Sequence, residues 1–120
     1  MSVPYRFTRQ QRLLKAAEYQ SVFKQAYKSS DRYLVVLARN NGQDGARLGL
    51  AISKKRIKLA VGRNRLKRLI RESFRQNQSA LSGLDCVILA RTGVAHANNQ
   101  TLLVSLARHW QQILSRCKNS

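Results

Sequence analysis

Positively charged side chains are concentrated in one stretch of the sequence, residues 54–75. Ten of its 22 residues are Lys or Arg, and only Glu72 is acidic. Arg presents a planar fork of N–H donors that fits two phosphate oxygens at once, whereas Lys supplies a flexible point charge. Together they provide the chemistry of polyanion binding, so this stretch is predicted to bind nucleic acid.

Apolar residues in this stretch recur at helical spacing, which predicts a helix from about Leu59 to Asn77. The arc expected to face the core carries Leu59, Leu66, Leu69, Ile70, Ser73 and Phe74. The opposite arc carries Asn64, Lys67, Arg68, Arg71 and Arg75. Cations four residues apart repel one another, and a pair between Arg68 and Glu72 is expected to offset part of that repulsion. A solvated helix face is the alternative, but an almost purely positive face favours a bound polyanion.

Side chains that could cleave a phosphodiester without a partner are sparse. The acids are scattered singly, at Glu18, Asp31, Asp44, Glu72 and Asp85. Metal-assisted cleavage needs clustered carboxylates, so no protein metal site is predicted. His96 or His109 could act as acid or base, but a surface or packing role is favoured for both. No Gly-rich phosphate loop, HExxH pattern or CxxC pair is present, so no catalytic residue is predicted.

Composition narrows the class of protein further. A length of 120 residues is sufficient for one domain with a modest core. The formal net charge is +18 and the hydrophobic content 43%, which indicates a folded basic protein and not a disordered tail. There is no apolar run that could span a membrane and no secretory signal. Cys86 and Cys117 form neither a disulfide framework nor a metal pattern. We therefore expect a cytoplasmic protein.

Before the basic stretch, a helix is predicted from Leu13 to about Lys28. Its aromatic stripe carries Ala16, Tyr19, Phe23 and Tyr27 at spacings of three and four. Core packing is the favoured role for any one ring, although aromatic rings beside cations also stack on the bases of a single strand. One edge of the stripe can be buried while the other lines a groove.

Three strands and a last helix complete the predicted scaffold. Residues 32–39 and 47–53 are expected to pair as an antiparallel hairpin, and residues 84–91 form a strongly apolar strand suited to a central position. The small face of residues 47–53, with Gly49, Ala51 and Ser53, leaves room for a ligand or for a closely packed helix. Asn98 or Asn99 is expected to cap a helix that ends near Arg116. Its inward residues are Leu102, Leu103, Leu106, Trp110, Ile113 and Leu114.

This order of helix, strand, strand, helix, strand, helix predicts a single α/β (α+β) sandwich over residues 1–120. The segments RLGLAISKK, at residues 47–55, and AVGRNRLKRLIRESFR, at residues 60–75, resemble the signature of the bacterial ribonuclease P protein subunit. That signature has a strand, two lysines, a short spacer and an Arg-Asn-Arg core followed by Lys-Arg and another Arg. The similarity extends over almost the whole chain.

The resemblance implies a subunit of a ribonucleoprotein that removes the 5′ leader from precursor tRNA. A catalytic RNA performs the hydrolysis, with magnesium bound mainly by the RNA, and one protein accompanies each RNA. The resemblance also implies a left-handed crossover around the basic helix, although right-handed crossovers dominate in general. The residues implied to contact RNA are Lys54, Lys55, Lys58, Arg63, Asn64, Arg65, Lys67, Arg68 and Arg71. Those implied for a leader-binding cleft are Tyr19, Phe23, Ala51 and Ser53, with Lys54 and Lys55 matching positions there as well.

Three other functions share the charge and size of this chain. A ribosomal or other structural RNA-binding protein would bind RNA without a role in cleavage. A DNA-binding regulator would read bases in the major groove, and a protein-only ribonuclease would cleave without an RNA partner. A membrane-active helix is disfavoured, because the apolar arc of the basic helix is needed for the core.

Overall fold

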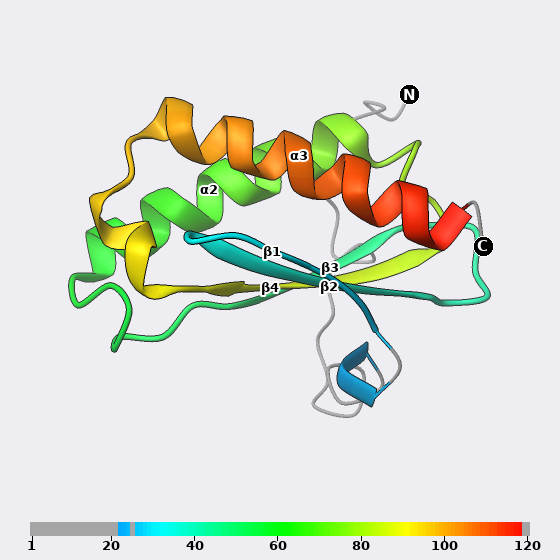
Figure 1. Cartoon of the computed structure of the whole chain (residues 1–120), viewed down its shortest axis with the longest axis horizontal. Helices are drawn as coiled ribbons and strands as arrows, with labels where there is room; N and C mark the ends of the chain where they lie inside the picture. Colours follow the sequence, from blue (N-terminus) through cyan, green and yellow to red (C-terminus); the bar gives the residue numbers. More distant parts are fainter. Residues whose placement is uncertain (1–21, 25, 119–120) are drawn as a thin grey trace, which may run out of the picture.

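A computed structural model describes residues 22–24 and 26–118, which form a four-stranded sheet with two long helices packed on one face (Figure 1). The strands are β1 Tyr27–Ser30, β2 Leu34–Asn40, β3 Arg47–Ala51 and β4 Leu84–Ala90. The helices are α2 Ala60–Asn77 and α3 Asn99–Lys118, and the 3-10 helix η2 Thr92–His96 connects β4 to α3. The α/β fold class predicted from the sequence is confirmed.

One strand, β1, was not predicted. It begins at Tyr27, so the end of the predicted helix from Leu13 to Lys28 is wrong. Residues 22–24 are helical, and the first part of that predicted helix lies outside the described residues. β1 has only four residues and owes its conformation to pairing with β2, where Tyr27 lies opposite Ala38. Because that pairing is tertiary, the local spacing of the aromatic residues could not reveal it.

The strand order is β1-β2-β4-β3, so the predicted hairpin between β2 and β3 is wrong. β4 lies between them, antiparallel to β2 and parallel to β3. Its nearly continuous apolar run, with both faces covered, explains this central position. The prediction of a central β4 is confirmed.

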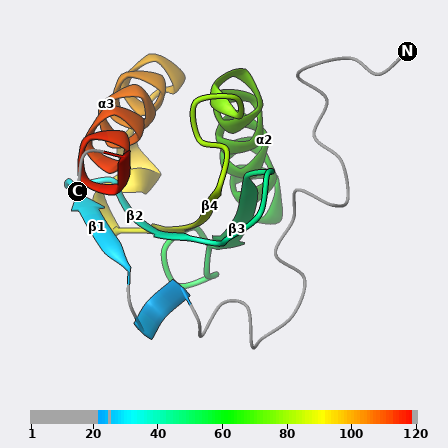
Figure 2. The same cartoon turned by 90° about the vertical axis from the view of Figure 1, so that its right-hand side faces the viewer.

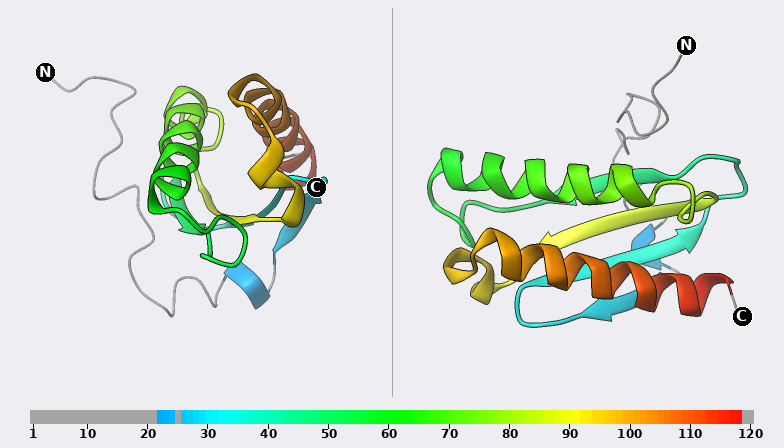
Figure 3. Two further views of the ribbon diagram at one scale, coloured as in Figure 1. Left: turned by 90° about the vertical axis from the view of Figure 1, so that its left-hand side faces the viewer. Right: turned by 90° about the horizontal axis from the view of Figure 1, so that it is seen from above.

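The connection from β3 through α2 to β4 is left-handed, as the resemblance implied. Figures 2 and 3 show the chain leaving β3 at the sheet edge, returning through α2 above the sheet, and entering β4 beside β3. A right-handed connection between the same strands would place α2 on the opposite face. The left-handed path therefore brings α2 alongside α3 and leaves the other face of the sheet without a long helix among the described residues.

The main core lies between the sheet and these two helices. Phe74 of α2 and Trp110 of α3 meet edge to face, with ring centroids 6.0 Å apart. The cap prediction is confirmed at Asn98, whose Oδ1 accepts a 2.8 Å hydrogen bond from the backbone N–H of Thr101. Two residues predicted to face inward do not. Leu59 is 70% exposed because it precedes the first turn of α2, and Leu103 is 39% exposed at the edge of the buried stripe of α3.

Candidate nucleic-acid interface

α2 buries one face and presents cations on the other. Leu66, Ile70 and Phe74 are fully buried, whereas Asn64, Arg65 and Arg68 are exposed and Lys67 and Arg71 are half-buried. The first turn has no acidic residue and no side-chain cap. Its backbone N–H groups therefore add the positive end of the helix dipole to the surrounding cations.

The expected pair between Arg68 and Glu72 does not form. Glu72 instead pairs with Arg75 one turn further along α2. Both spacings bring side chains together on a helix, so the sequence alone could not decide between them. Arg68 consequently has no carboxylate partner among the described residues, and its charge faces solvent.

Arg63 shapes the loop that carries the lysines. Its Nη1 donates to the carbonyl oxygens of Ile57 at 2.9 Å and Lys58 at 2.7 Å. A Cβ atom on Gly62 would lie 2.8 Å from Cγ2 of Ile57, so only glycine lets the loop pack this closely on α2. These contacts fix the loop while Lys54, Lys55 and Lys58 remain exposed.

Two further arginines join this region to the C-terminal part of the chain. Nη1 of Arg65 donates to Oδ1 of Asn99 at 2.7 Å, at the start of α3. Nη1 of Arg56 donates to Oγ1 of Thr92 at 2.8 Å, in η2. Arg56 was outside the predicted contact residues, and its place in the basic stretch was the only sequence signal for it. Side-chain hydrogen bonds therefore join the basic loop to η2 and α2 to the start of α3.

The opposite face of the sheet carries Phe23 and Ala51, two of the residues implied for the leader cleft. Val22 is fully buried against Val87, and the next residue, Phe23, is 48% exposed. Ala51 lies opposite Leu89, which packs with Val87 on this same face. The structure thus brings Phe23 and Ala51 to one sheet face, with Ser53 just beyond the end of β3. Tyr19 lies outside the described residues.

Two carboxylates of the described residues, those of Asp85 and Glu72, pair with arginines. Asp85 accepts from Arg47 Nε at 2.8 Å and Nη2 at 2.6 Å across β3 and β4, and Glu72 pairs with Arg75. Within residues 22–24 and 26–118, no three His, Cys, Asp or Glu side chains cluster closely enough to hold a metal ion.

His109 lies in the interior and not on the cationic surface. Its Nδ1 is 2.7 Å from Oγ of Ser29, and its Nε2 lies 3.1 Å from Oδ2 of Asp31 without the alignment of a hydrogen bond. Burial lowers the pKa of His109, and the nearby Asp31 carboxylate offsets this only partly. A histidine only 2% exposed cannot reach a nucleic-acid substrate. His96, in η2, is exposed.

The comparison with known proteins decides the family. A family model described as Ribonuclease P matches residues 7–114. The chain belongs to the ribonuclease P protein family. It is 47% identical over 116 residues to the ribonuclease P protein component of Methylococcus capsulatus, an alignment that covers 97% of this chain and 91% of the relative. This membership does not favour the alternative of a ribosomal protein.

Solved structures of ribonuclease P proteins share the fold. The protein from Staphylococcus aureus is 32% identical with a TM-score of 0.78, and the match covers 84% of this chain and 93% of that one. The protein from Thermotoga maritima is 31% identical with a TM-score of 0.71, and the match covers 88% of this chain and 96% of that one.

In this ribonuclease P protein, the predicted RNA contacts on α2 and the predicted leader contact Phe23 lie on different sides of the sheet. α2 is on the helical side and residues 22–24 are on the other, whereas the loop from β3 to α2 drops below the sheet, toward the side of residues 22–24 (Figure 2). No helix among the described residues has the length and apolar character needed to cross a membrane.

Proposed function

We propose that this chain is the protein subunit of ribonuclease P, the ribonucleoprotein that removes the 5′ leader from precursor tRNA. A catalytic RNA performs the hydrolysis, and magnesium is bound mainly by RNA. The chain supplies binding surfaces and no catalytic residue. Residues 1–120 act as one domain, and one copy of the protein binds each catalytic RNA. The ribonucleoprotein acts in the cytoplasm and does not bind a membrane. The observation that carries this proposal is the cationic face of α2 in a chain whose family model spans residues 7–114.

The catalytic RNA occupies the surface of α2 and the basic loop. Its contact residues are Lys54, Lys55, Lys58, Arg63, Asn64, Arg65, Lys67, Arg68 and Arg71. Exposed Arg68 suits a bidentate phosphate contact, and the three lysines suit looser electrostatic attraction. Arg63 contributes mainly by holding the loop, since its guanidinium already donates to two loop carbonyls.

The 5′ leader occupies the opposite sheet face. Half-exposed Phe23 can stack on a base without reading its identity, which suits leaders of variable sequence. Small Ala51 leaves space above β3, and Ser53 and Tyr19 complete this contact. Mature tRNA lacks the leader, so a protein that holds the leader binds precursor more tightly than product.

An omission experiment tests this function. The protein, its cognate catalytic RNA and precursor tRNA are mixed at low magnesium, and each component is left out in turn. Cleavage at the leader junction should require the RNA and be stimulated by the protein. Neutralising about six phosphates should also give a log–log salt slope of roughly −4 to −5 for protein–RNA binding. Cleavage by rigorously RNA-free protein, or a protein without effect on the RNA, would reject the proposal.

A further inference from the structure

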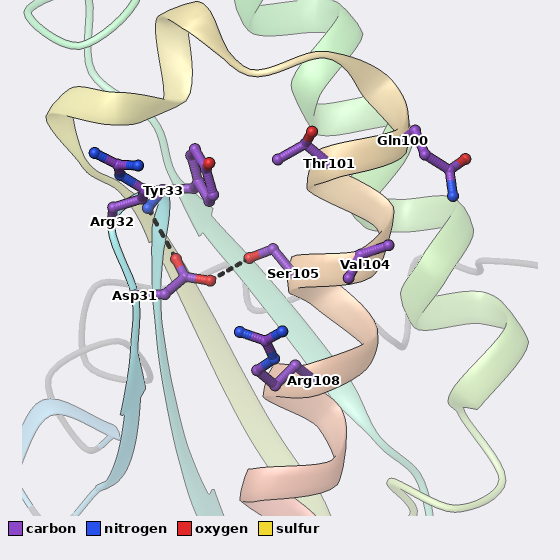
Figure 4. A pocket seen from close by; sticks show the side chains of 8 residues that line it. All are labelled: Asp31, Arg32, Tyr33, Gln100, Thr101, Val104, Ser105 and Arg108. Atoms are coloured by element: carbon purple, nitrogen blue, oxygen red, sulfur yellow. Dashed lines mark hydrogen bonds between the residues drawn. The ribbon is translucent and has the colours of Figure 1, made fainter.

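A pocket of about 500 Å³ lies between α3 and the turn that joins β1 to β2 (Figure 4). Residues 31–33 line it from the turn, and α3 contributes Thr101, Val104, Ser105 and Arg108. Figure 4 shows the Tyr33 ring pointing toward the side of α3 that carries Thr101. Neither the α2 surface nor the face carrying Phe23 includes these residues, so the function proposed above leaves the pocket unexplained.

The pocket has a fixed polar wall. Oδ1 of Asp31 accepts from the backbone N–H groups of Tyr33 at 2.8 Å and Leu34 at 2.9 Å. Its Oδ2 accepts from Oγ of Ser105 at 2.5 Å. These bonds lower the pKa of Asp31, although burial alone would raise it. The carboxylate thus fastens the turn to α3.

The mouth of the pocket is cationic and its interior largely apolar. Arg32 and Arg108 are both exposed, and within the described chain neither forms an ion pair. The Arg32 guanidinium lies 5.9 Å from the centroid of the Tyr33 ring. Val104 is 49% exposed, which leaves apolar surface open beside these charges. An aromatic ring and a valine with a cation on the same helix match a nucleobase with its phosphate.

We propose that this pocket binds one unpaired nucleotide of the catalytic RNA, with the base against Tyr33 and Val104 and the phosphate at Arg108. Its volume falls in the range of small-ligand pockets. The choice of RNA rests on the proposed function and on continuity with α2, because Arg65 bonds Asn99 in the first turn of α3. An RNA strand on Arg65 therefore lies beside the helix end that leads to Thr101 and Val104.

The contribution of the base to binding is tested first, with the protein in the absence of the catalytic RNA. Amide chemical shifts of the full chain are followed during titration with adenosine monophosphate and, separately, with ribose 5-phosphate, which lacks the base. Adenosine monophosphate should shift the Tyr33, Thr101 and Val104 amides more strongly than ribose 5-phosphate does. Equal shifts would show an anion site only, and absent shifts would show no site; either result overturns the proposal.

Two variants that add the same negative charge at different positions on α3 then test where the nucleotide binds. Val104→Glu adds a negative charge in the pocket, whereas Gln111→Glu adds the same charge to exposed surface two turns along α3, outside the pocket. Val104→Glu should abolish the nucleotide-induced shifts and weaken binding of the catalytic RNA about tenfold, the size expected for one stacked base. Gln111→Glu should leave both unchanged. Equal affinities of the two variants for the RNA would overturn the proposal that the pocket binds a nucleotide of that RNA.

Arg65→Ala separates this inference from the proposed function. Weaker RNA binding by Arg65→Ala with normal binding by Val104→Glu rejects the pocket and keeps the function. If wild-type protein does not bind the catalytic RNA, the proposed function fails, and the pocket's assignment to that RNA fails with it. Thermal unfolding of each variant confirms that the fold is intact, as expected for a substitution at half-exposed Val104.

Discussion

Nε1 of Trp110 donates a 2.8 Å hydrogen bond to Oγ of Ser73, inside the contact between α3 and α2. Trp110 is 1% exposed and Ser73 is 8% exposed. The bond satisfies an indole N–H that has no access to water. It also fixes the rotation of α2, and therefore the direction in which its cations point.

Ser73→Ala should destabilise the protein by about 1–3 kcal/mol, because it leaves the buried indole N–H without an acceptor. Urea unfolding measures the change. Ser79→Ala, at an exposed position after α2, is the control and should have little effect. Equal stability of the two variants would show that the Trp110 bond contributes nothing.

Arg68→Ala should weaken binding of the catalytic RNA by about tenfold to a hundredfold, the loss expected for one charged hydrogen-bonding contact. It should also reduce the salt slope by about one. Filter binding across a salt series measures both quantities. Unchanged affinity would remove Arg68 from the interface.

Arg65→Ala should weaken the same complex, but Arg65 also bonds Asn99 within the protein. Asn99→Ala removes that bond and keeps the Arg65 charge, so it distinguishes the two roles. We expect Asn99→Ala to bind RNA nearly as well as wild type. Equal losses in the two variants would mean that Arg65 acts by holding α3 and not by contacting RNA.

Phe23→Ala should weaken binding of precursor tRNA by the holoenzyme about tenfold, through the loss of stacking on the leader. Binding of mature tRNA should not change. Leu103→Ala, a partly exposed apolar residue on α3, is the control on the other side of the sheet. An equal loss for precursor and mature tRNA in Phe23→Ala would refute the leader contact.

Stability should fall as the solution is acidified from about pH 7.5 to about pH 5.5, because the pKa of His109 is lower in the folded protein than in the unfolded chain. The unfolded chain then binds more protons, so protonation favours unfolding below the ordinary histidine pKa. Urea unfolding at both pH values should show a smaller decrease for His109→Gln than for wild type. His96→Gln, at an exposed position, should retain the wild-type decrease.

Local pattern was sufficient for the basic helix and for β4, because their apolar spacing reflects burial along one element. It was not sufficient for β1, whose four residues depend on pairing with β2. It also could not show that β3 pairs with β4, which begins at Leu84, 33 residues after β3 ends. The site shows the same division. The cations of α2 were evident from their spacing, but the bond from Arg63 to the basic loop and the fastening of Asp31 to Ser105 join separate segments, and no spacing rule reports them.

The insertion of β4 between β2 and β3 also affects synthesis of the chain on the ribosome. Translation proceeds from the N-terminus, so a nascent chain that ends before Leu84 contains two strands whose shared neighbour has not yet been made. The most positively charged segment thus emerges ahead of the strand that completes its support.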